Sequence, residues 1–107
     1  MITVIHHRDL NRVTVEGHAQ SGEVGHDLVC ASASILVYTL AAFVENMKTS
    51  GQVKNPTIEL AEGKATVYCN APKRIKAPIT LAFDTVCAGF GLLAHNYPEN
   101  ISYKIMG

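Results

Sequence analysis

The longest stretch of this chain without a charged side chain runs from Leu28 to Val44, and it limits the possible folds more than any other feature. It includes serine, threonine and tyrosine, and it falls short of the roughly 20 apolar residues that a bilayer span needs. We therefore expect a central, well-buried helix that is capped by Asp27 and ends near Lys48. The predicted helical stripe comprises Ala31, Ile35, Tyr38, Ala42 and Val44.

Alternating apolar and polar residues on both sides of this helix predict strands. The first two strands meet at the turn signal Asp9-Leu-Asn11, and the next two meet at Glu62-Gly63, a favoured hairpin corner. The predicted strands are Ile2–His7, Arg12–Gly17, Thr57–Leu60, Lys64–Asn70 and a last one containing Ile101, Tyr103 and Ile105.

A second helix is predicted from about Pro78 to His95, because proline suits a first helical turn. Gly89 and Gly91 weaken it by about 1 kcal/mol each relative to alanine, unless close packing needs them. The order ββαββαβ predicts a single α+β domain with a mainly antiparallel sheet packed against two helices. The apolar face of this helix is predicted to comprise Ile79, Phe83, Val86, Phe90 and Leu93.

The charge balance argues against a broad nucleic-acid surface. The chain has 9 Lys and Arg against 9 Asp and Glu, whereas phosphate backbones select a basic face. We interpret Lys73-Arg74-Ile75-Lys76 as a solvated loop, with contact to RNA phosphates as the alternative. So few charges favour self-association, through a strand edge or through the second helix, where Gly89 and Gly91 permit close approach.

The cysteines indicate a compartment and exclude two kinds of site. The chain has three cysteines, which are Cys30, Cys69 and Cys87. An odd count without a C-x-x-C pair argues against a disulfide framework and a zinc knuckle. Free thiols, and a start at Met1 without the features of a signal peptide, indicate the cytoplasm. We expect no cofactor, no membrane partner and no direct contact with nucleic acid.

One cysteine lies where a helix start can activate it. With Asp27 as the cap, Cys30 occupies the third helical position, close to unpaired backbone N–H groups and to the positive end of the helix dipole. Such a position favours the nucleophilic thiolate. His18 can reach back from the end of a strand to take the thiol proton and return it to a leaving amine. The same N–H groups can stabilise an oxyanion.

The same residues allow two other interpretations. Free cysteine is among the most buried residue types, and composition alone favours buried filler for Cys30. His18, His26 and Cys30 also provide three ligands for an open zinc site, with Asp27 or Glu23 as the orienting carboxylate, although the thiol chemistry fits better.

The other cysteines and histidines fit structural roles. Cys69 lies in a strand pattern and Cys87 in an amphipathic helix, so we expect both thiols to be inert. We expect His6, His7 and His95 to be partly exposed structural histidines.

The region around Cys30 resembles the signature of a known family. It reads Gly17-His18-Ala19, then a short glycine-bearing loop, then Gly25-x-Asp27-Leu28-Val29-Cys30-Ala31-Ser32-Ala33-Ser34. This pattern is similar to that of the ribosomal-processing cysteine proteases of bacteria, the Prp family. The likeness covers essentially the whole chain in length and element order, and its specific part is Gly17 to Ser34. Leu28 and Ser32 depart from the common pattern, and neither departure removes a functional group.

The resemblance implies a cysteine endopeptidase that removes an N-terminal extension from a large-subunit ribosomal protein. It implies His18 and Cys30 as the catalytic pair, with Gly17, Asp27 and Ser34 in support. The resemblance therefore favours the interpretation of Cys30 as a nucleophile over its interpretation as a buried core residue. It also implies a homodimer, and a loop that closes over the substrate. That substrate loop comprises Gln20, Ser21, Gly22, Glu23, Val24 and Gly25.

A function of another class stays open at this point. The chain can instead be a non-catalytic, ribosome-associated binding module whose cysteine is incidental. In that case Lys73, Arg74 and Lys76 carry the contact.

Overall fold

The computed structural model describes residues 1–17 and 26–107, with side chains described from Leu28 onward in the second range. The chain also forms two short 3₁₀ turns, η1 (Arg8–Leu10) and η2 (Lys73–Ile75). The predicted order ββαββαβ is confirmed, and every predicted bound lies within two residues of the observed one. The elements are β1 (Ile2–His7), β2 (Arg12–Glu16), α1 (His26–Thr49), β3 (Thr57–Ala61), β4 (Lys64–Tyr68), α2 (Lys76–Asn96) and β5 (Ile101–Met106).

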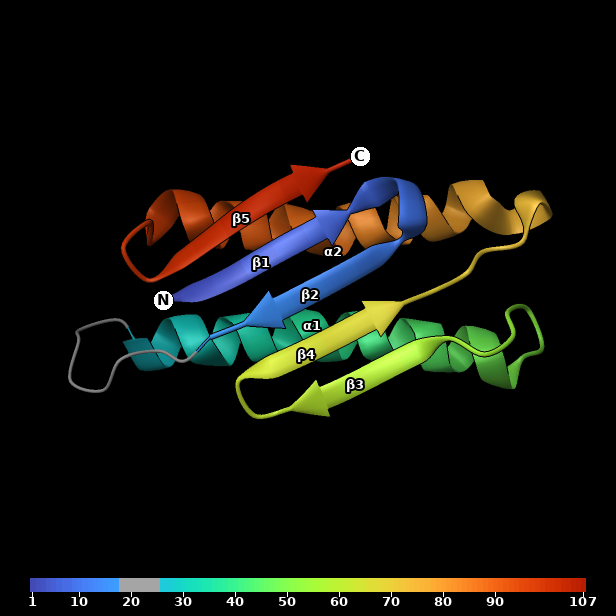
Figure 1. The fold of residues 1–107 in the computed structure, drawn as a ribbon, viewed down its shortest axis with the longest axis horizontal. Helices are drawn as coiled ribbons and strands as arrows, with labels where there is room; N and C mark the ends of the chain where they lie inside the picture. The colour runs from blue at the N-terminus through green and yellow to red at the C-terminus, as the bar shows by residue number, and fades with distance from the viewer. Residues whose placement is uncertain (18–25) are drawn as a thin grey trace.

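The strands form one five-stranded sheet in the order β3-β4-β2-β1-β5. In this described sheet three neighbouring pairs are antiparallel, and β1 and β5 run parallel. The parallel pair arises because α2 carries the chain from β4 past β2 and β1 to the far edge (Figure 1). The mainly antiparallel sheet of the predicted α+β fold is therefore confirmed.

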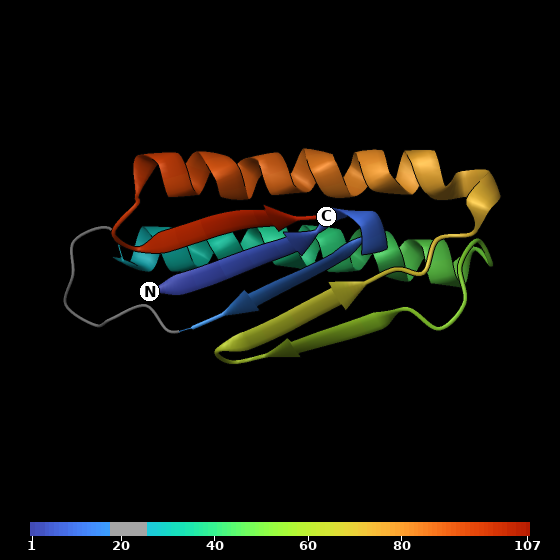
Figure 2. The same ribbon diagram turned by 45° about the horizontal axis from the view of Figure 1, so that its top comes forward.

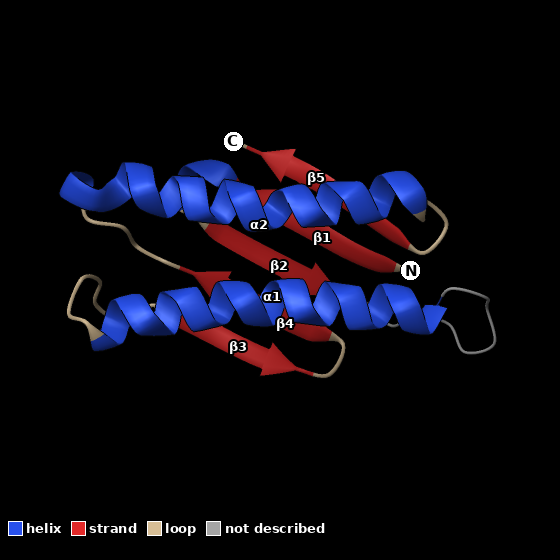
Figure 3. Ribbon diagram, turned by 180° about the vertical axis from the view of Figure 1, so that it is seen from behind, coloured by secondary structure: helices blue, strands red, loops and turns tan. Residues whose placement is uncertain are grey.

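The two helices lie side by side on one face of the sheet, so the fold has two layers (Figures 2 and 3). Ile2, Val4 and His6 of β1 point into the layer between sheet and helices and are buried, as their alternation predicts. The fully buried apolar side chains of this core include Val4, Val13, Val29, Leu40, Val44, Val67, Ile79, Phe83 and Phe90.

The buried face of α1 differs from the predicted one. Ile35 and Tyr38 are 62% and 53% exposed, and Ala31 and Ala42 are also exposed, so only Val44 of the predicted stripe is correct. Because this helix has no charged side chain through most of its length, the sequence offers no polar face to mark the side that meets solvent. The helix is an outer layer and not a central element. Its buried positions are Val29, Ala33, Val37, Leu40, Ala41 and Val44.

The packing of α2 follows the prediction more closely. Val86 and Leu93 of the predicted face are partly buried, and Cys87 is buried with it. A Cβ on Gly89 would lie 2.7 Å from Cδ2 of Leu36 in α1, so the close contact of the two helices needs this glycine. Pro78 is the third helical residue, where its missing N–H costs no intrahelical hydrogen bond. The buried predicted positions are Ile79, Phe83 and Phe90.

The outer faces of both helices are unusually apolar. By length and composition alone, Leu28–Thr49 and Lys73–Asn96 could each cross a membrane, contrary to the expectation for the first helix. The inner face of each helix packs on the sheet, so this apolar character belongs partly to the core. The exposed large apolar side chains that remain outside are Leu28, Ile35 and Tyr38 on α1, and Leu81 and Leu92 on α2.

His6 is buried, contrary to the expectation of partial exposure, with 1% of its surface accessible. Its Nδ1 lies 3.0 Å from the hydroxyl of Tyr103, while its Nε2 has no hydrogen-bond partner among the described residues. Burial lowers the pKa of His6 below its ordinary value of 6.5. The charge of Asp84 opposes that shift, and the charges of Arg8 and His7 add to it. The fold therefore holds this imidazole in its neutral form.

Acidification should destabilise the protein through His6. Below pH 6.5 the unfolded chain binds a proton that the folded chain rejects, so stability falls as the pH drops from about 6.5 toward the lowered pKa. One such proton gives a slope of at most about 1.4 kcal/mol per pH unit. Urea unfolding of the His6→Gln variant should show a smaller loss between pH 7.5 and 5.5 than the parent protein. A slope in His6→Gln that equals the parent slope would contradict this account.

Candidate active site

Cys30 is the fifth residue of α1, because the helix begins at His26. Asp27 is therefore the second helical residue and not the predicted cap, and its side chain lies outside the described residues. The N–H group of Cys30 belongs to the helical ladder, and the N–H groups that have no acceptor within the helix end at Leu28. Since helical side chains lean toward the N-terminus, the Cys30 side chain still covers the first turn and its dipole.

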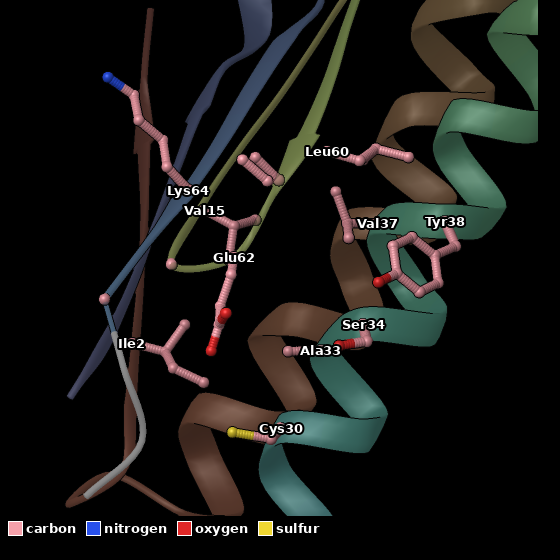
Figure 4. Close-up of a pocket in the computed structure, with 14 residues that line it drawn as sticks. Ile2, Val15, Cys30, Ala33, Ser34, Val37, Tyr38, Leu60, Glu62 and Lys64 are labelled. Carbon is pink, nitrogen blue, oxygen red and sulfur yellow. The ribbon is translucent and has the colours of Figure 1, made fainter.

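Cys30 lines an open pocket with a volume of about 480 Å³ (Figure 4). The pocket lies between the first half of α1, the ends of β1 and β2 near Ile2 and Gly17, and the β3–β4 hairpin. The Cys30 side chain is partly exposed, and its sulfur points away from α1 (Figure 4). Partial exposure is what a reactive thiol needs, and it argues against buried filler. The apolar walls are formed by Ile2, Val15, Ala33, Val37, Leu60 and Ala65.

Two of the predicted supporting residues line the same pocket. Ser34 lies one turn after Cys30 on α1, and Gly17 lies where the chain leaves β2. Gly17 has a φ of 113°, which favours glycine, and a Cβ there would overlap the carbonyl oxygen of Met1. Its N–H donates to the carbonyl oxygen of Gly63 at 3.0 Å. This position therefore requires glycine, and it is held between the backbone of Met1 and the backbone of Gly63.

The predicted base and the predicted substrate loop, residues 20–25, lie outside the described residues. His18 follows directly on Gly17, which lines the pocket with Cys30. β2 ends and α1 begins at the same end of the molecule (Figure 1). The side chain of His26 is not described either, so the alternative zinc site is not tested.

The other two cysteines are buried and unsuited to nucleophilic chemistry. Cys69 and Cys87 are 0% and 1% exposed. Burial raises the pKa of both thiols, that of Cys87 to about 12 despite an opposing hydrogen bond with Tyr103. The expectation that both are inert agrees with this burial.

Sequence analysis missed the contribution of the β3–β4 hairpin. Glu62 and Gly63 were predicted only as a turn, yet both line the pocket, and Leu60 and Tyr38 extend it. The hairpin reaches the site because β4 pairs with β2, with Ala65 opposite Val15. Such a pairing between distant segments leaves no local mark on the sequence.

The cationic segment lies elsewhere. η2 and the start of α2 are at the opposite end of the molecule from the start of α1 (Figure 1). Lys73 and Lys76 border a shallow second hollow together with Arg8, which Asp84 already binds through two nitrogens at 2.9–3.0 Å. Contacts of the alternative binding module would therefore use a surface separate from the Cys30 pocket.

Comparisons with known proteins agree on one family. The family model described as cysteine protease Prp matches residues 1–102. The ribosomal processing cysteine protease Prp of Staphylococcus aureus (strain Mu50) is 46% identical over 105 residues, covering 96% of this chain and 95% of the relative.

Two solved structures share the fold. SMU.848 from Streptococcus mutans superposes with a TM-score of 0.66 at 28% identity, over 98% of this chain and 91% of that one. The S. aureus protease Prp with a covalently linked product peptide superposes with a TM-score of 0.72 at 25% identity, over 99% and 100%.

Proposed function

The chain belongs to the Prp family of cysteine proteases, and we propose that Cys30 is its nucleophile and His18 its general base and acid. The substrate that we propose is the N-terminal extension of a large-subunit ribosomal protein, since the S. aureus relative is named a ribosomal processing protease. The observation that carries the assignment of Cys30 is its partly exposed thiol in an open pocket, whereas Cys69 and Cys87 are buried. The thiols of Cys69 and Cys87 form no disulfide with the described part of the chain, which supports a cytoplasmic location.

The reaction follows the usual course of thiol acyl transfer. His18 takes the thiol proton, and the Cys30 sulfur forms a bond to the carbonyl carbon of the scissile peptide. Backbone N–H groups at the start of α1 are suited to stabilise the oxyanion that develops. The C–N bond then breaks, and the amine leaves with the proton from His18. Water, activated by the same histidine, hydrolyses the thioester and restores the thiol.

Alkylation of the folded protein tests this assignment. Iodoacetamide should modify Cys30 while Cys69 and Cys87 stay protected, because the alkylating reagent needs an accessible thiolate. Cleavage of a peptide copied from the ribosomal protein's N-terminus should decline in step with Cys30 modification, as mapped by mass spectrometry. Full cleavage by a completely Cys30-alkylated protein would contradict the mechanism. Absence of cleavage by the unmodified protein would favour the binding module.

We also propose that the protein is a homodimer in which a second copy covers the outer faces of α1 and α2. Exposed large apolar side chains lie on both helices, namely Leu28, Ile35 and Tyr38 on α1 and Leu81 and Leu92 on α2. The residues from Leu28 to Val44 carry no charge. Asp84 is the one charged residue in the middle of α2, and it is bound to Arg8. Gly89 does not serve this interface, because the side chain of Leu36 in the same chain fills the space beside its Cα atom.

A charged residue on this face should separate the copies. Light scattering at tens of micromolar should give the mass of a dimer for the parent and of a monomer for Ile35→Glu, whose site is 62% exposed. Leu10→Glu is a matched control on η1, at a site that is 49% exposed, and should stay dimeric. A monomeric parent protein, or flotation of the parent with lipid vesicles, would overturn the dimer proposal.

A further inference from the structure

The pocket around Cys30 has apolar walls and one carboxylate directed into it. Glu62 extends from the β3–β4 turn toward the end of the pocket where Cys30 lies (Figure 4). Lys64 also borders the pocket, but its side chain points away, and its Nζ lies 3.8 Å from Oε1 of Glu16 (Figure 4). Among the described lining residues, Glu62 is thus the one whose charge faces the space that a substrate would occupy.

The turn that carries Glu62 is held in place by the backbone. Gly63 has a φ of 78°, as the second corner of a tight turn requires, and its carbonyl oxygen accepts the N–H of Gly17. This hydrogen bond joins the hairpin to the segment that leads into His18. The backbone next to Glu62 is therefore held against the end of β2 that borders the Cys30 pocket.

The carboxylate of Glu62 has no ion pair with the part of the chain that the structure describes. A peptide that delivers its scissile bond to Cys30 has to pass between α1 and the hairpin, because these two elements form opposite walls of the pocket. Bound peptide would displace water from Glu62 and strengthen its interaction with any charge that the peptide brings close. A basic side chain would be attracted, and an acidic one would be repelled.

We propose that Glu62 is a specificity-determining residue, whose carboxylate binds a lysine or arginine side chain of the substrate peptide close to the scissile bond. The inference rests on the proposed function, since it assumes that peptides are cleaved at Cys30. It adds a preference for substrate charge to a pocket whose other lining residues are mostly apolar.

The test uses N-acetylated peptides of the extension in which one residue at a time near the scissile bond is lysine, norleucine or glutamate. The parent should cleave the lysine peptide with a kcat/KM about three- to fivefold above the norleucine peptide at one position, the range expected for a partly exposed ion pair. Glu62→Gln should remove this ratio, and Glu62→Lys should favour the glutamate peptide. The preference should shrink at 1 M salt, because ions screen exposed charges.

The matched control is Glu59→Gln, on the same hairpin but outside the pocket, which should keep the lysine preference. Peptides with a free N-terminal amine show whether an α-amino group can replace lysine. A lysine preference that survives in Glu62→Gln, or one that is absent from the parent at every position, would overturn the proposal.

Binding measurements separate this inference from the proposed mechanism. Calorimetry with Cys30→Ala should give a lower Kd for the lysine peptide than for the norleucine peptide, and Cys30→Ala/Glu62→Gln should bind the two equally. If no peptide were cleaved, the proposed function would fail while this difference in Kd would still support the charge preference. Equal affinities in Cys30→Ala would overturn it independently of catalysis.

Discussion

Cys30→Ala should abolish cleavage of the ribosomal N-terminal peptide, with a loss of at least about a thousandfold in kcat. Removal of the sulfur removes the atom that forms the thioester, and the other two cysteines are 0% and 1% exposed and cannot replace it. Because the Cys30 side chain is only partly buried, the shorter alanine should leave the fold intact. The measurement is the rate of product formation by mass spectrometry, together with a circular dichroism spectrum.

The matched control for this substitution is Cys87→Ala. It also removes one sulfur atom, but Cys87 belongs to α2 and packs in the hydrophobic core. Cys87 does not line the pocket of Cys30. We expect this variant to lose some stability to the cavity and to keep its cleavage rate. Undiminished cleavage by Cys30→Ala would refute the assignment of the nucleophile.

His18→Ala should lower kcat/KM by about 10²–10⁴, the usual contribution of a positioned general base. Without the imidazole, the thiol proton and the leaving amine depend on solvent. In the parent, kcat/KM should fall on acidification, because a protonated base cannot accept the thiol proton. The variant should lose that limb of the profile, and added imidazole should restore part of its rate.

His26→Ala distinguishes this role of histidine from the zinc site. A general base at His18 predicts that His26→Ala and a chelator leave cleavage nearly unchanged. A zinc site that uses both histidines predicts losses for both variants and for the chelator. His95→Ala, on the exposed end of α2, should have no effect on the rate.

Much of the architecture could be predicted from local sequence signals. Alternation in Ile2–His7 predicted both the strand and its buried face, because every second side chain of a strand points the same way. The Glu62-Gly63 corner predicted a hairpin, since glycine adopts the positive φ that this turn uses. The stretch from Gly17 to Ser34 predicted the family, and four of its residues, Gly17, Cys30, Ala33 and Ser34, line one pocket.

The amino-acid sequence by itself determined which segments become strands and helices and which cysteine lies at a helix start, because these properties depend on neighbours along the chain. Only the tertiary structure decided which face of α1 is buried, since that helix is apolar on all sides and the sheet selects among them. It also decided that the β3–β4 hairpin places Glu62 at the pocket that Cys30 lines, and that His6 is buried against Tyr103 of β5. These arrangements depend on pairings between residues far apart in sequence, whose energies no local pattern encodes.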